Sequence, residues 1–148
     1  MMGKYRDYLE LLGIGAVVIG LFFVGYELRQ NQIGMQAQIR GIQLQTDLES
    51  LRSQREDERL LVLLSKEWGF ENTDRARHTI YIRELTRTAE HDFFQYRIGA
   101  LDSEEFEGRR NMWRELFSQP TYRDRWERTK DHFSSSFRTE FDQLLLER

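Results

Sequence analysis

The chain has 148 residues, enough for one modest domain, and its formal net charge is −3. It has no cysteine, which excludes disulfide frameworks, thiolate metal sites and cysteine nucleophiles. With 1 proline, 10 glycines and 13% aromatic residues it is neither collagen-like nor disordered. The negative net charge offers no overall attraction to nucleic acid.

An apolar segment near the N-terminus predicts a membrane span. The window 9–28 is charged only at Glu10 and Glu27, close to its two ends. About 20 helical residues cross a hydrocarbon core of roughly 30 Å. We therefore expect a short N-terminal tail at residues 1–8 and a transmembrane helix at residues 9–28. Two alternatives are a buried helix of a soluble domain, which the polar remainder could hardly cover, and a signal peptide, for which no small-residue cleavage site follows.

The same helix is predicted to continue beyond the membrane. No proline or turn cluster interrupts residues 29–65, so we expect a stalk helix over that range. Its apolar side chains recur at helical spacing and predict a surface that packs on the rest of the chain. This apolar seam consists of Ile33, Ala37, Leu44, Leu48 and Leu51.

A second face of this long helix carries small and polar residues. At 100° per residue these residues fall on one side of the helix, away from the apolar seam. This small-and-polar stripe consists of Gly13, Ala16, Gly20, Glu27, Asn31, Gly34, Gln38, Gly41 and Gln45. One interpretation is close helix–helix packing, because small residues let backbones approach in lipid. The alternative is a water-lined axis in a ring of subunits, with Glu27 and Asn31 at one mouth.

The remaining residues, 72–148, predict a bundle of about four short helices that packs on the stalk. Capping residues place helix starts at residues 72–74, 102–103 and 134–136, and Pro120 suits the first turn of another helix. Alternating strand patterns of useful length are absent from the sequence. The predicted fold is thus all-α, with one N-terminal transmembrane helix continuing into a long amphipathic stalk helix before the bundle.

The sequence contains few residues in the spacing that metal-binding or catalytic sites require. Asp74 and His78 are four residues apart and could share a metal ion, but His91 falls on another side of that helix and His132 lies near a helix end. Glycine-rich phosphate loops and nucleophile elbows are also missing from the sequence. We therefore expect no enzyme activity, no catalytic residue, no metal and no cofactor.

Two motifs resemble a group of uncharacterised bacterial membrane proteins. The apolar segment ends in Tyr26-Glu27-Leu28-Arg29-Gln30-Asn31-Gln32, and Phe93-Phe94-Gln95-Tyr96 precedes the turn Gly99-Ala100-Leu101-Asp102. Members of the group have a single N-terminal membrane helix ending in an Arg-Gln-Asn motif, followed by a helical domain. The resemblance implies a single-pass protein of the bacterial inner membrane with a cytoplasmic C-terminal domain, and it implies no activity.

Together these patterns lead to one functional expectation and two alternatives. We expect a non-enzymatic scaffold or accessory subunit that self-associates through its transmembrane and stalk helix, with membrane lipids and its own copies as partners and no nucleic acid. The first alternative is a small homo-oligomeric ion channel lined by the stripe. The second is a single-copy subunit that docks on a larger membrane complex.

Overall fold

The computed structural model describes the backbone of residues 2–147 and the side chains of residues 10–147. Over these residues the fold is all-α, as predicted, with six α-helices, one 3₁₀ turn and no strand. The chain divides into two compact units, Met1–Gln36 and Ala37–Arg148, which are described separately.

Helix α1 (Met2–Glu56) begins earlier than predicted and also ends earlier. Residues 2–8, expected as a tail, have helical backbone, and residue 1 lies outside the described part of the chain. In the unit Met1–Gln36 the described apolar side chains other than Ile33 are exposed, for example Leu11 at 74% and Phe22 at 76%. Of the helices that the structure describes, this one alone has the length and apolar composition that a membrane span requires.

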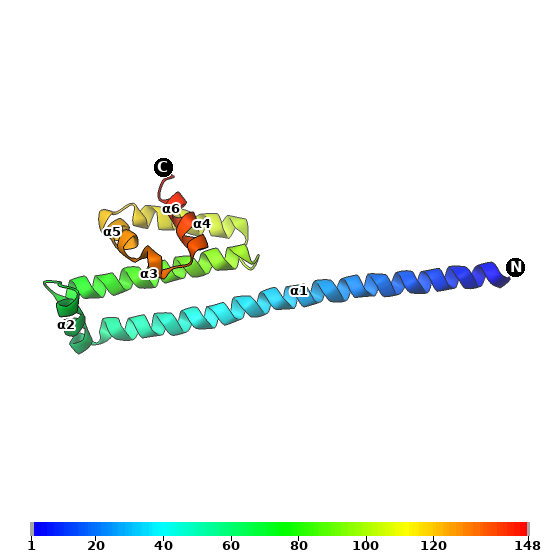
Figure 1. Cartoon of the computed structure of the whole chain (residues 1–148), viewed down its shortest axis with the longest axis horizontal. Coiled ribbons are helices and arrows are strands. Elements are labelled where there is room, and N and C mark those ends of the chain that lie inside the picture. Colours follow the sequence, from blue (N-terminus) through cyan, green and yellow to red (C-terminus); the bar gives the residue numbers. More distant parts are fainter. Residues whose placement is uncertain (1, 148) are drawn as a thin grey trace. The chain divides into compact units, whose positions relative to one another are not determined.

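The continuous stalk predicted for residues 29–65 is wrong beyond Glu56. Asp57 has extended backbone (φ −80°, ψ 101°), and its carboxylate accepts hydrogen bonds from the backbone N–H groups of Arg59 and Leu60. It is therefore the N-cap of a separate helix, α2 (Glu58–Glu67), which lies at a corner of the chain (Figure 1). Apolar burial on both sides of this corner favours the break, since Leu51 and Leu61 enter the same hydrophobic cluster.

Helix α3 (Thr73–Arg97) is the central element of the unit Ala37–Arg148. Gly69 at φ +67° closes the loop before it, and the side chain of Asn72 caps it. In Figure 1, α3 lies between residues 37–56 of α1 and the group of helices α4 to α6. Gln95 donates a hydrogen bond to Ala37, and Arg55 forms an ion pair with Glu84. Because the contact made later in α1 is made earlier in α3, this part of α1 runs antiparallel to α3.

The C-terminal helices cover the other side of α3. They are α4 (Ser103–Phe117), α5 (Pro120–Thr129) and α6 (Ser135–Leu144), with the 3₁₀ turn η1 (Lys130–His132), which the sequence did not predict, between the last two. Their aromatic side chains form most of the larger core, in which Trp126, Phe117, Phe137 and Phe141 are almost fully buried. The smaller core joins α1, α2 and the start of α3 through Leu51, Leu61, Ala76 and Ile80.

Candidate functional site

The apolar seam is the shielded side of α1. Ala37, Leu44 and Leu48 are half-buried, and Leu51 is 7% exposed. Ile33, the first seam residue, belongs to the unit Met1–Gln36 and is half-buried. In the larger unit the seam therefore faces the helices that follow it in the chain.

Polar contacts also fix residues 37–56 of α1 to α3. The side-chain amide of Gln95 donates to the carbonyl of Ala37 at 3.2 Å, and Arg55 Nε lies 3.3 Å from Glu84 Oε1. Glu84 is only 7% exposed, and burial raises the pKa of its carboxyl although Arg55 acts to lower it. The pair therefore offsets part of the cost of burying this carboxylate on α3.

The small-and-polar stripe has a different environment. Its members are exposed, except for Gly41, which is half-buried. Gly41 is four residues after Ala37 and three before Leu44, so its placement in the stripe needs correction: it lies on the shielded side. The exposed members are Gly13, Ala16, Gly20, Glu27, Asn31, Gly34, Gln38 and Gln45.

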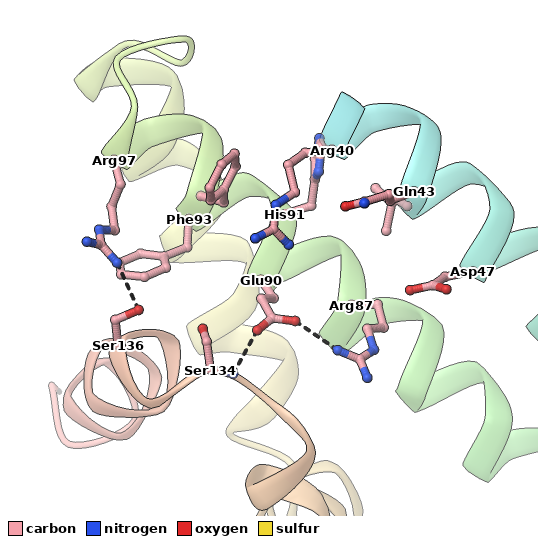
Figure 2. Close-up of a pocket in the computed structure, with 12 residues that line it drawn as sticks. Arg40, Gln43, Asp47, Arg87, Glu90, His91, Phe93, Arg97, Ser134 and Ser136 are labelled. Carbon is pink, nitrogen blue, oxygen red and sulfur yellow. Dashed lines mark hydrogen bonds and ion pairs between the residues drawn. The ribbon is translucent and has the colours of Figure 1, made fainter. Parts of the chain in front are cut away.

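A groove of about 150 Å³ lies in the unit Ala37–Arg148. Residues 40–47 of α1 form one wall, α3 forms the floor, and the start of α6 forms the other wall (Figure 2). We call it the arginine groove because its charged lining consists of Arg40, Asp47, Arg87, Glu90 and Arg97, with His91 beside them.

The charged groups in the arginine groove have unequal partners. Glu90 accepts from Arg87 Nη1 and from the backbone N–H of Ser134, both at 2.9 Å, so each of its two oxygens accepts one hydrogen bond (Figure 2). Among the side chains that the structure describes, neither Arg40 nor Arg97 has a carboxylate within 4.0 Å. Each guanidinium instead lies over a phenylalanine ring, Arg40 on Phe94 at 4.5 Å and Arg97 on Phe93 at 5.6 Å.

His91, on α3, is one of the residues that line the groove. Its Nε2 is 3.1 Å from the side-chain amide nitrogen of Gln95. Burial, together with the charges of Arg109 and Arg40, lowers the pKa of His91. The imidazole is therefore neutral at neutral pH and adds no charge to the groove.

The residues considered for a metal ion have other partners. Asp74 forms an ion pair with Arg77 at 3.1 Å, and the rings of His78 and Tyr122 pack nearly perpendicular to each other with centroids 5.4 Å apart. His132 contacts Arg87 through its backbone carbonyl, which accepts a hydrogen bond, and not through its imidazole. Within residues 10–147, no group of three or more histidine, aspartate or glutamate side chains is placed to hold a metal ion.

Sequence reasoning did not identify the arginine groove. One signal was available: Arg40 occupies the position eleven residues before Leu51, where the seam would have an apolar side chain. The contribution of α6 could not be predicted, because it depends on how the bundle folds back over α3. No family model matches the chain, nor does any curated protein or solved structure match it.

Proposed function

We propose that this chain is a non-enzymatic, single-pass membrane protein that self-associates through the small-and-polar stripe of α1 and acts as a scaffold or accessory subunit. We further propose that this membrane is the bacterial inner membrane and that the unit Ala37–Arg148 lies in the cytoplasm. The observation that carries it is the environment of the α1 glycines.

These glycines have no role that the single chain explains. A Cβ built at Gly13, Gly20 or Gly34 meets nothing within 4 Å, and none of the three has positive φ. A glycine inside a helix costs roughly 0.5–1 kcal/mol relative to alanine. Within one chain, alanine would therefore fit at these positions and stabilise α1. Close approach of a second helix, by contrast, would require that these positions have no Cβ.

The division of α1 into two faces supports the same proposal. In the stalk part, the apolar seam is covered by the chain's own helices, while Gln38 and Gln45 of the stripe are exposed. A second copy could therefore contact the stripe without displacing α3. Amide side chains such as these can hydrogen-bond across a helix–helix contact.

Mass measurement of the full chain in a mild detergent tests the proposal. One chain has a mass of 17.9 kDa, and we expect a defined multiple of it by light scattering. Gly20→Leu should shift the particle towards the single chain, because the added side chain separates the helices. Gly25→Leu is the matched control, since Gly25 is also open but lies off the stripe, and it should leave the mass unchanged.

Three results would contradict self-association through the stripe. They are a wild-type particle of one chain at all concentrations, an equal effect of both leucine substitutions, and a stoichiometric foreign subunit in place of a second copy. The last result would instead support docking on a larger complex.

A further inference from the structure

We propose that the arginine groove is a binding site for a phosphate group, carried either by a lipid headgroup or by a small soluble molecule. The proposal goes beyond self-association and concerns a different surface, since none of the charged residues that line the groove belongs to the stripe.

Two guanidinium groups in the groove are available to an anion. Arg40 and Arg97 lack a carboxylate partner among the described side chains, and Arg97 Nη1 donates a hydrogen bond to Ser136 Oγ at 2.8 Å. Stacking on phenylalanine fixes the plane of a guanidinium and leaves the N–H groups on its edge free. Such planar donors bind phosphate oxygens in pairs.

The balance of charge in the groove also favours an anion. Three arginines face two carboxylates, Asp47 and Glu90, which leaves one positive charge. Glu90 already forms an ion pair with Arg87 and accepts from the N–H of Ser134, so its charge is largely balanced within the groove. Asp47 remains on the α1 wall, where it can accept a hydrogen bond from a hydroxyl or amine next to the phosphate.

The size of the groove fits a phosphate ester. Its volume of about 150 Å³ is about ten times the roughly 10–15 Å³ that one water needs. The wall residues Arg40 and Asp47 come from α1, whereas Arg97 comes from α3 and Ser136 from α6. The lining of the groove therefore comes from three helices.

Isothermal titration of the full chain in an uncharged detergent tests this site. The probes are inorganic phosphate, dihexanoyl phosphatidic acid and, for the carboxylate class, acetate, all at constant ionic strength. We expect at least one phosphate probe to bind with a stoichiometry near one per chain and acetate to bind at least tenfold more weakly. Saturation by inorganic phosphate would identify a soluble ligand, and saturation by phosphatidic acid alone would identify a lipid headgroup; both results support the site.

Substitutions locate the binding. Arg40→Gln and Arg97→Gln should each weaken the bound phosphate probe by about tenfold or more, because each removes a charge-assisted donor pair. Arg59→Gln is the matched control, since Arg59 is an exposed arginine on α2 outside the groove, and it should change affinity less than about twofold. Absence of saturable binding by both phosphate probes, equal binding of acetate, or an equal loss in Arg59→Gln would overturn the proposal.

Discussion

Replacement of Arg55 by methionine should destabilise the unit Ala37–Arg148 in a pH-dependent way. Arg55 Nε lies 3.3 Å from Glu84 Oε1, and the two side chains are 28% and 9% exposed. Methionine keeps much of the volume but removes the charge. Glu84 would then hold a buried carboxylate without its nearest partner.

The expected loss can be bounded from burial. Removing one partner of a fully buried ion pair costs about 3–5 kcal/mol. Because Arg55 is partly exposed and water can reach the vacated position, we expect about 1–3 kcal/mol at neutral pH. Arg59→Met on the exposed surface of α2 is the control and should change stability by less than about 0.5 kcal/mol.

The pH dependence gives the sharper test. Burial already raises the pKa of Glu84, and loss of Arg55 should raise it further. When the folded pKa of a carboxyl exceeds the unfolded one, stability falls as pH rises through the folded value and is recovered as pH falls. The cost of Arg55→Met should therefore shrink as pH falls from neutral towards the ordinary pKa range of a carboxyl group.

Urea unfolding of the full chain in detergent, followed by circular dichroism at several pH values, measures both quantities. The double variant Arg55→Met/Glu84→Gln should recover part of the loss at neutral pH, because the buried charge is gone. A cost that does not vary with pH, or no cost at all, would refute the view that Glu84 depends on Arg55.

Three further predictions concern the elements that shape the unit. Asp57→Ala removes two hydrogen bonds at the α2 N-cap and should cost about 0.5–2 kcal/mol in urea unfolding, whereas Asp57→Asn should keep most of the cap. Leu61→Ala empties a fully buried position and should cost about 2–5 kcal/mol by the same assay; a cost below about 1 kcal/mol would mean that the smaller core is loosely packed. Trp126→Phe removes the 2.7 Å hydrogen bond from the indole Nε1 to Asp142 and should lower the melting temperature, with Asp142→Asn reproducing only part of the effect.

Local signals in the sequence were sufficient for most of the helices. The proline at residue 120 and the capping groups at Asn72 and Asp102 each lie where a helix begins in the structure. These features act within a few residues of the helix end, so a single sequence carries them in full. The end of α3 at Arg97 is also marked locally, because Gly99 with φ +77° follows two residues later.

The break at Asp57 shows where local reading fails. Aspartate inside a run of charged residues fits an exposed helix surface as well as a cap, and neither a proline nor a glycine marks the site. Whether Asp57 caps a new helix or continues the old one depends on Leu51 and Leu61, which reach the same hydrophobic cluster only if the chain turns between them. That gain is tertiary, so propensity and spacing alone could not reveal it.

Candidate sites were predicted unevenly for a related reason. The stripe and the seam follow from periodicity along one helix, and the structure separates them, apart from Gly41. The arginine groove brings together Arg40, Arg97 and Ser136 from three helices. Only the packing of the bundle makes these residues neighbours, and no pattern along the chain indicates it.

The two hydrophobic clusters on α3 have a consequence for how the unit comes apart. Ala76 and Ile80 belong to the smaller cluster, whereas Ile82 and Ala89 belong to the larger one, so one helix is shared by two separate cores. Local opening of one core need not expose the other, and unfolding can then proceed in two steps. The tryptophans would report the steps separately, because Trp68 packs on the smaller cluster while Trp113 and Trp126 belong to the larger. If the corner at α2 opens before the aromatic core melts, the fluorescence of a variant that keeps only Trp68 should change at a lower denaturant concentration than that of a variant that keeps only Trp113 or Trp126.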